Sequence, residues 1–314
     1  MEQTGMIKRL LVGTDGSAAT WGAIRFAAAM AREHGVEVHV LAVLEPLTRA
    51  AGALSIELPH FEEVERIRSA DLERRVVDLV NGAFERRDEW SLSVRSGVVA
   101  ASVAQEARDV EADLVVLGRR FRPASVPAGH STALEILALA PVPVLVAARD
   151  LAGLPRVALA AVDFGEASRC AARTSLEILT QPGGRLKLVH VIPPLDFPAA
   201  VLWGWSDTFA RQVPCEFERF TAALDAPPGL DVSTEVAKND PGTELLTQAR
   251  DTGADLIVAG SHGYLYRDRV LVGTVARRLL REASASVLLA PAGDMLAHGA
   301  RAVAAEQSLT LTAS

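Results

Sequence analysis

The sequence predicts two tandem α/β domains, each with a doubly wound, Rossmann-like parallel sheet. Three observations predict this fold: the chain has 314 residues, its apolar segments repeat in the same order, and helical patterns alternate with them. Hydrophobic residues make up 49% of the chain and aromatic residues 5%, a balance typical of parallel strands covered by helices on both faces. A chain of this length fits two domains of about 150 residues.

The repeat consists of four pairs of apolar segments, one member from each half. The first pair reads IKRLLVGTDGS and PRVALAAVDFG, so each copy is an apolar run followed by an Asp. The third pair, ADLVVLG and ADLIVAG, begins with Ala-Asp-Leu and ends in Gly. Matched strands in the same order indicate a duplication. The pairs are 7–17 with 155–165, 36–46 with 184–194, 112–118 with 254–260, and 141–147 with 285–291.

Helical patterns lie between these predicted strands. Segments 18–34 and 167–180 follow the first strands, and segments 99–111 and 243–253 precede the third strands. This alternation requires crossovers between parallel strands, which place a ligand site beyond the carboxyl ends of the strands. We therefore expect functional residues directly after the strands.

Each half carries an additional segment after its second strand. Segment 47–90 contains a charged, periodic helix around 61–87, and segment 195–224 contains Trp203 and Trp205. Both segments could serve as lids, as interfaces or as packing. Aromatic residues spaced by two in an insertion more often cover a core than clamp a base or a partner.

The matched strands also set the expected domain boundaries. We expect a first domain over 1–150 and a second over 151–295, because the closing strand of each half ends just before these limits. The last stretch, 296–314, is Ala-rich and polar and has no matching strand, so we expect a flexible tail.

Charge and composition exclude several classes of function. A formal net charge of −7 argues against a nucleic-acid partner. Cys170 and Cys215 are too few for a disulfide framework or a four-thiolate zinc site and fit a reducing cytoplasm. Residues 1–8 lack an apolar signal core, and no apolar run approaches the roughly 18 residues that span a bilayer. We therefore expect a cytoplasmic protein without a membrane partner.

A glycine-rich loop follows the third strand of the second half. Gly260 and Gly263 stand three residues apart, and Gly273 with Thr274 follows ten residues later at the expected start of a helix. Glycines let the backbone approach a ligand, and the unpaired N–H groups of a helix start favour phosphate. The Thr274 hydroxyl adds a further hydrogen-bond donor. Residues that could line the approach are Ser261, His262, Arg267 and Arg269.

These four positions resemble the universal stress protein family, whose nucleotide-binding members show Gly, two residues, Gly, nine residues, then Gly and Ser or Thr. The resemblance covers both halves and implies the adenine nucleotide alpha hydrolase-like fold. It implies ATP as the ligand, with or without Mg²⁺, held at the base and ribose by residues of the first two strands and at the phosphates by the loop. The implied nucleotide-binding residues are Ala161, Val162, Asp163, Val191, Gly260, Ser261, His262, Gly263, Gly273, Thr274 and Val275.

The first half departs from this pattern. Phe121 occupies the place of the second glycine, the next glycine comes early, and Pro123 and Pro127 stiffen the loop. Arg119, Arg120 and Arg122 could attract an anion, although solvated loop arginines are more common than a new phosphate site. The candidate degenerate first site comprises Thr14, Asp15, Val43, Gly118, Gly129, Ser131 and Thr132.

Simpler interpretations remain for single residues. Asp163 could only cap the helix that follows, and the glycines could only form a tight turn. The triplet 163–165 reads Asp-Phe-Gly, but no His-Arg-Asp loop or strand lysine accompanies it, so we do not predict a kinase. No Gly-x-x-x-x-Gly-Lys loop is present, which argues against a classical NTPase. His262 has no nucleophile or carboxylate paired with it by sequence, so we assign no catalytic residue and no metal ligand.

The expected function is a regulatory ATP-binding module that serves stress tolerance through an unknown protein partner. Two alternatives stay open: a slow ATPase or adenylating enzyme of the same fold, and a scaffold that binds no nucleotide. The resemblance also implies that the two halves pair across their closing strands, 142–147 and 286–290, and that a homodimer can form.

Overall fold

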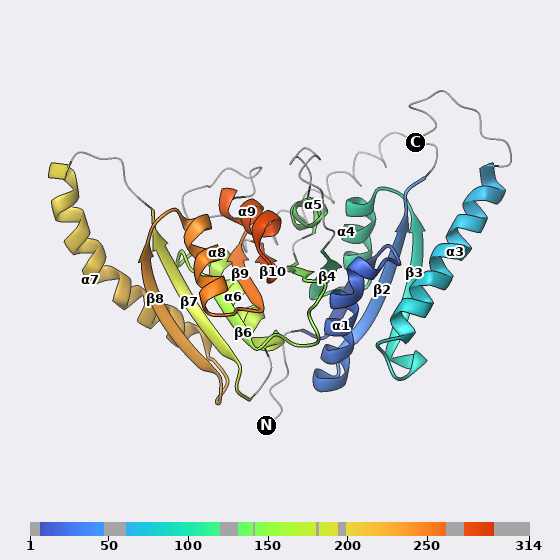
Figure 1. Ribbon diagram of the computed structural model, residues 1–314, viewed down its shortest axis with the longest axis horizontal. Helices are drawn as coiled ribbons and strands as arrows, with labels where there is room; N and C mark the ends of the chain where they lie inside the picture. The colour runs from blue at the N-terminus through green and yellow to red at the C-terminus, as the bar shows by residue number, and fades with distance from the viewer. Residues whose placement is uncertain are drawn as a thin grey trace, which may run out of the picture. The chain divides into compact units, whose positions relative to one another are not determined.

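The computed structural model divides into two compact units, Met1–Leu154 and Pro155–Ser314 (Figure 1). Each unit is an α/β fold with a parallel sheet, which confirms the predicted fold class. The backbone is described for residues 7–46, 61–119, 131–140, 142–179, 182–193, 199–261 and 273–291, and the side chains of the same residues except 61, 87 and 199–211.

The sheet of the first unit has the strand order β3-β2-β1-β4-β5. All neighbouring strands in this series run parallel, with Leu10 of β1 opposite Val38 of β2 on one side and Leu114 of β4 on the other. The chain moves outward from β1 to β3 and then returns past β1 to β4, so the order reverses between β1 and β4. The strands are β1 (Arg9–Thr14), β2 (Glu37–Leu44), β3 (Trp90–Ser96), β4 (Leu114–Gly118) and β5 (Val144–Ala147).

Helices connect these strands. Right-handed crossovers place α1 and α3 on one face and α4 and α5 on the other, and α4 and α5 contact one another. Helix α1 ends because Gly35 adopts the left-handed conformation (φ 66°) and donates its N–H to Ala31 O. The helices are η1 (Ala18–Thr20), α1 (Trp21–His34), α3 (Phe61–Asn81), η2 (Arg87–Glu89), α4 (Val99–Asp109) and α5 (Thr132–Leu139).

The second unit repeats this topology with the strand order β10-β9-β6-β7-β8. Its neighbouring strands are also parallel. The strands are β6 (Val157–Ala161), β7 (Arg185–Ile192), β8 (Asp231–Lys238), β9 (Leu256–Gly260) and β10 (Ser286–Ala290). The helices are α6 (Glu166–Ile178), α7 (Ala199–Leu224), α8 (Pro241–Asp251) and α9 (Thr274–Glu282).

The Asp of each Ala-Asp-Leu motif joins two strands at their amino ends. Asp113 Oδ2 accepts hydrogen bonds from the backbone N–H groups of Lys8 and Arg9, at 2.8 and 2.9 Å. Asp255 Oδ2 accepts the equivalent pair at the start of β6, at 2.9 and 3.1 Å. A carboxylate that accepts two backbone N–H groups fixes the register of the strands it joins. The repeat of this motif therefore has a structural cause in both units.

The four matched segment pairs form eight strands as predicted, namely β1, β2, β4, β5, β6, β7, β9 and β10, but two strands were missed. β3 and β8 keep many exposed or half-buried residues, so they lack the apolar run that marks a strand buried on both faces. The predicted helix over 61–87 ends at Asn81, and 18–34 begins with a 3-10 turn before α1. The segment 195–224 is largely one long helix, α7.

Candidate functional site

The turn after β6 carries the Asp that the sequence singled out. Asp163 Oδ1 accepts the N–H of Gly165 at 3.0 Å, and Ser168 Oγ donates to Gly165 O at 3.0 Å. Phe164 lies between them with a left-handed backbone (φ 63°). The first unit forms the same turn, where Asp15 Oδ1 accepts the N–H of Ser17 at 3.0 Å. Asp163 therefore orders the turn that leads into α6, but it does not cap the helix, because the N-cap is Gly165 and no side chain caps it.

The other predicted base and ribose residues lie at the same edge of the sheet. Ala161 ends β6 opposite Val189 of β7, so Val191 lies two residues further toward the carboxyl ends. Val162 is buried and donates its N–H to Val189 O at 2.8 Å. His190 Nδ1 donates to Val162 O at 2.7 Å. The structure thus brings Ala161, Val162, Asp163 and Val191 to one edge of the sheet, together with a histidine that sequence reasoning missed.

Gly260, the first glycine of the loop motif, has a packing role. A Cβ at this position would lie 2.8 Å from Ala167 Cβ and 3.0 Å from the backbone nitrogen of Ser168. Gly118 is equally constrained, since a Cβ there would lie 2.5 Å from Thr20 Cα. These glycines allow the first turn of the helix to pack against the strand end. This contact also places the end of β9 beside the turn that carries Asp163.

The two ends of the loop motif meet. Ser261 is buried, donates its N–H to Ala290 O at 2.8 Å, and accepts the N–H of Gly273 on its own carbonyl at 2.9 Å. Gly273 is the N-cap of α9, and Thr274 is its exposed first residue. The first N–H groups of a helix lack intrahelical partners and carry the positive end of its dipole. Val275 belongs to this first turn, whereas His262, Gly263, Arg267 and Arg269 lie outside the described residues.

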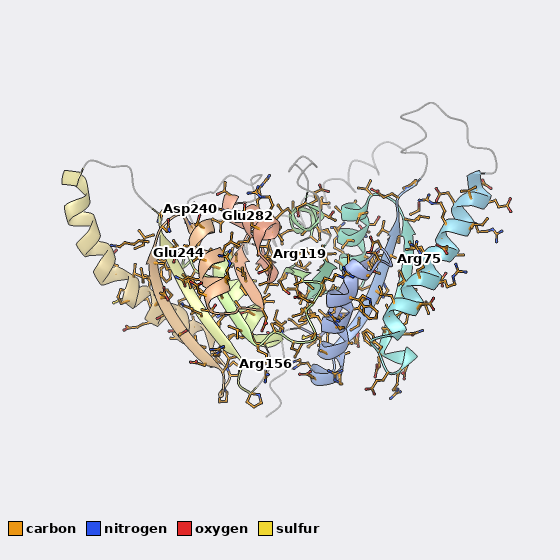
Figure 2. All side chains as sticks on the ribbon, in the orientation of Figure 1. Arg75, Arg119, Arg156, Asp240, Glu244 and Glu282 are labelled. Carbon is orange, nitrogen blue, oxygen red and sulfur yellow. The ribbon has the colours of Figure 1, made fainter. Side chains whose placement is uncertain are left out.

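The first unit keeps only part of this arrangement. Arg119 takes the place of Ser261 and donates its N–H to Ala147 O at 3.1 Å (Figure 2). Burial lowers the pKa of the Arg119 guanidinium below its ordinary value, and the charge of Asp150 acts in the opposite direction. Ser131 is the N-cap of α5, which starts at Thr132. Gly129 and the residues 120–128 lie outside the described part of the chain.

Two other residues of the candidate first site are engaged in the fold. Thr14 is buried, and its Oγ1 accepts the N–H of Gly16 at 3.0 Å and lies 3.0 Å from Thr20 Oγ1. Val43 lies in β2 opposite Arg95 of β3. The hydroxyls of Thr14 and Thr20 are hydrogen bonded within the turn. The first unit thus has hydroxyl groups at this edge of the sheet, where the second unit has the apolar side chain of Val162.

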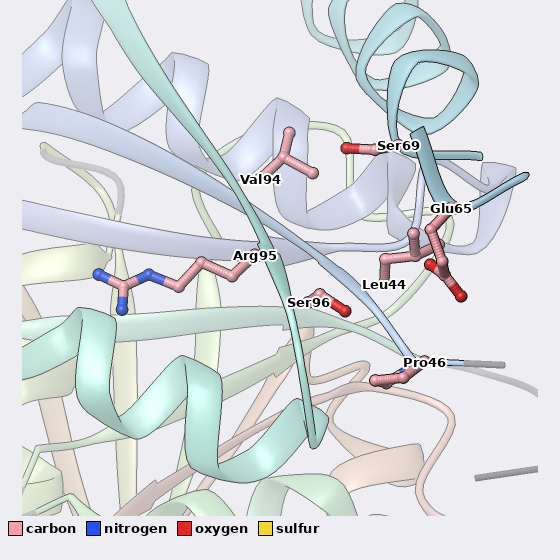
Figure 3. A pocket seen from close by; sticks show the side chains of 7 residues that line it. All are labelled: Leu44, Pro46, Glu65, Ser69, Val94, Arg95 and Ser96. Atoms are coloured by element: carbon pink, nitrogen blue, oxygen red, sulfur yellow. The ribbon is translucent and has the colours of Figure 1, made fainter. Parts of the chain in front are cut away.

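A pocket of about 400 Å³ lies at the carboxyl ends of β2 and β3 in the first unit. Figure 3 shows Glu65 and Ser69 projecting from α3 opposite Val94 and Ser96, while Arg95 extends from the other side of β3. Arg95 is committed elsewhere, because it pairs with Glu106 and with Asp109. The remaining lining residues are Leu44 and Pro46. The lining offers no uncommitted cation for a phosphate group.

A polar cluster lies between α4 and the strands β2 and β3. His39 Nε2 lies 2.7 Å from Glu106 Oε1, and His39 Nδ1 lies 2.6 Å from Ser91 Oγ. This order of groups resembles a hydrolase triad, but Glu106 is also paired with Arg95 and His39 is also within 3.0 Å of Ser93 Oγ. The cluster thus neutralises a buried carboxylate.

The second unit supports this structural interpretation. At the equivalent place, Lys187 pairs with Glu235 at 2.6 Å and Gln248 Nε2 donates to Glu235 at 2.7 Å. The acidic residue of the second unit, Glu235, lies on the strand β8, and the amide of Gln248 on α8 takes the place that Glu106 has in the first unit. A charge pair that recurs with its acidic member exchanged between helix and strand has a structural role, because a buried carboxylate needs a partner.

Charged residues surround the start of α8 next to α9. Asp240 accepts hydrogen bonds from Thr243 N and Oγ1, at 2.9 and 2.7 Å, and Arg278 of α9 pairs with it. The bonds from Thr243 and the charge of Arg278 lower the pKa of Asp240 below its ordinary value. Glu282, labelled with Asp240 in Figure 2, pairs with Arg278 as well. Arg278 is therefore held between two carboxylates.

Three features of the described residues bear on other functions. In those residues, no group of three or more His, Cys, Asp or Glu side chains could hold a metal ion. Among the described helices, none is both long and apolar enough to cross a membrane. Burial raises the pKa of the Cys170 thiol, which disfavours its reactive thiolate form.

Comparisons with known proteins agree with the repeat and the fold. The universal stress protein family matches residues 6–148 and 156–291. A universal stress protein of Mycolicibacterium smegmatis is 28% identical over 308 residues, covering 92% of this chain and 99% of the relative. One of Mycobacterium tuberculosis H37Rv is 26% identical over 303 residues, covering 90% and 94%.

A solved structure extends the likeness of fold along most of the chain. The crystal structure of a universal stress protein from Archaeoglobus fulgidus covers 93% of this chain and 98% of its own, with a TM-score of 0.64 and 18% identity. The family matches each of the two units separately, which agrees with a duplicated domain. The chain belongs to the universal stress protein family and carries two of its domains in tandem.

Proposed function

We propose that the second unit binds ATP at the carboxyl edge of its sheet and that the protein is a nucleotide-dependent regulatory module in stress tolerance. One observation carries the proposal: Ser261 and Gly273 are hydrogen bonded at the start of α9, so the two ends of the glycine motif meet. The Asp163 turn lies beside them, because Gly260 packs against the first turn of α6.

The residues suggest a division of roles. The N–H groups at the start of α9 and the Thr274 hydroxyl would bind phosphate oxygens. Ala161, Val162, Asp163 and Val191 would contact the base and ribose. Mg²⁺ would enter with the nucleotide, since Mg²⁺ in such sites keeps several waters and is bound through the substrate phosphates. We propose no hydrolytic step.

We propose a supporting role for the first unit. Arg119 stands where Ser261 stands in the second unit, and Thr14 is hydrogen bonded within its own turn. Phe121 replaces the second glycine of the motif. A site altered at these positions would hold phosphate less well than the complete motif.

Calorimetry on nucleotide-stripped protein tests the proposal, with ATP, ADP and AMP as ligands and with or without Mg²⁺. We expect one ATP per chain. Two ATP molecules per chain would show that the first unit binds as well, and no binding would overturn the proposed function.

A matched pair of variants tests the site itself. Thr274 and Thr132 are both exposed and both begin a helix after the N-cap. Thr274→Val should weaken ATP binding roughly ten- to a hundredfold, since a hydrogen bond to a charged group contributes about 1.5–3 kcal/mol. Thr132→Val should leave the affinity unchanged. Equal affinities in both variants would reject the Thr274 hydroxyl as a phosphate ligand.

A further inference from the structure

Phe164 has a backbone conformation that its side chain disfavours. It follows Asp163 directly and has a φ of 63°, in the left-handed region that residues with a Cβ rarely adopt. Such a conformation persists only where the surrounding structure holds it. The contacts of Phe164 therefore matter for the turn that carries Asp163.

Three rings hold the Phe164 side chain. Its ring centroid lies 4.8 Å from that of His190, 5.1 Å from that of Phe217 and 6.1 Å from that of Phe220, and both phenylalanine pairs meet edge to face. Phe217 and Phe220 belong to α7 and are buried. His190 is fixed in turn by the hydrogen bond from its Nδ1 to Val162 O. The turn is thus joined through one side chain to α7 and to β7.

The first unit shows that the turn itself does not need this ring. Gly16 occupies the equivalent position with a φ of 70°. A Cβ there would lie 3.3 Å from Arg75 Cβ and 3.4 Å from Val76 Cγ2, so α3 packs against the backbone of the turn. Ala42 stands where His190 stands in the second unit. The aromatic connection to the long helix is therefore a property of the second unit, the one with the complete glycine motif.

We propose that Phe164 is a positioning residue that couples the Asp163 turn to helix α7, so that α7 and a ligand of this turn stabilise one another. The ligand part rests on the proposed ATP binding. Coupling between two sites is reciprocal: a helix that stabilises the binding conformation is itself stabilised by the ligand. Pro214 removes an intrahelical hydrogen bond about one turn before Phe217, close to the anchored end of α7. Helix α7 is then the element through which nucleotide occupancy reaches a partner.

The first experiment needs no ligand. Phe217→Ala removes a ring contact of Phe164, and Leu224→Ala is the matched control, because Leu224 is equally buried on α7 but carries no ring. Amide exchange is measured at Gly165, whose N–H is bound by Asp163. We expect Phe217→Ala to accelerate this exchange roughly fivefold or more, within the usual range of coupling between sites, and Leu224→Ala to leave it unchanged. Equal effects of the two variants would overturn the coupling.

The second experiment adds ATP to the full-length chain. ATP should slow the amide exchange of residues 212–224 in the wild-type protein. Phe164→Gly, which installs the residue of the first unit, should abolish this protection, and Phe164→Leu, which keeps an apolar side chain, should restore part of it. Phe217→Ala should lower ATP affinity and Leu224→Ala should not.

The outcomes separate the two proposals. ATP binding without protection of α7 would overturn the coupling and leave the proposed function intact. No ATP binding in the wild-type protein would reject the proposed function, and the exchange at Gly165 in the ligand-free variants would then decide the coupling alone.

Discussion

Gly260→Ala tests whether the first glycine of this motif is needed for packing of the fold or only for the approach of a ligand. The new Cβ would lie 2.8 Å from Ala167 Cβ and 3.0 Å from Ser168 N, whereas carbon atoms in contact are about 3.5–4.0 Å apart. Both atoms belong to the first turn of α6, so the helix must move away from β9. Overpacking of this kind costs about 1–3 kcal/mol. We therefore expect the nucleotide-free protein to lose that much stability.

Gly273→Ala is the control within the same motif. Gly273 has a φ of −54°, which alanine adopts readily, and the new Cβ would be in ordinary contact with Ser261 O at 3.4 Å. Its effect on the free energy of unfolding should stay within about 0.5 kcal/mol.

The assay must follow the second unit alone, because a chain of two units need not unfold in one step. We would measure amide exchange of β9 and α6 in urea, in protein stripped of nucleotide. If Gly260→Ala matches the wild-type stability there, the packing argument is wrong and the glycine serves only a ligand.

Three further predictions concern the fold. Asp255→Ala should destabilise the second unit, and Asp113→Ala the first, by about 2 kcal/mol each, since each variant loses a carboxylate that binds two backbone N–H groups. Urea denaturation of the two variants checks this, and a loss of stability in only one of the two variants would contradict the shared role. Asp240 has a lowered pKa in the folded protein, so its contribution is present above its ordinary value of 3.8 and is lost as the pH falls through the folded value; Asp240→Asn should flatten the acid limb of a stability-against-pH curve, and an unchanged curve would refute it. Arg25 donates to Leu151 O at 2.9 Å and to Arg149 O at 2.8 Å; Arg25→Ala should speed proteolysis within 149–154, and an unchanged cleavage rate would show that these bonds do not restrain the segment.

Eight of the strands could be predicted because they are largely buried. Val12, Leu114 and Leu159 are fully buried, so their segments read as continuous apolar runs that repeat between the halves. β8 reads DVSTEVAK, with most residues exposed or half-buried, and its sequence could equally belong to a polar connection. The position of an end strand depends on its pairing with a neighbour, which composition alone does not encode.

The candidate site was predictable only where it is local in sequence. Gly260, Gly273 and Thr274 could be selected by their spacing, and their placement at the ends of β9 and the start of α9 follows from the strand and helix signals. The packing role of Gly260 depends on Ala167, almost a hundred residues earlier in the chain. The contacts of Phe164 with residues of β7 and α7 are likewise made by the fold, and no periodic pattern marks them.

The duplication acts as an internal comparison of fold and function. Both units keep the Asp that clamps two strands and the glycine that lets a helix pack on a strand end. Both also keep the turn in which Asp15 or Asp163 accepts a backbone N–H, so that Asp alone does not identify a nucleotide site.

The units differ in the residues that surround this shared frame. At the edge beyond the strands, Ser261 is replaced by Arg119, and the ring of Phe164 is replaced by the bare backbone of Gly16. The turn forms with either residue, each in its own surroundings: α3 packs against Gly16, and rings of β7 and α7 surround Phe164. The differences at these positions are where a ligand-binding role of the second unit should be sought.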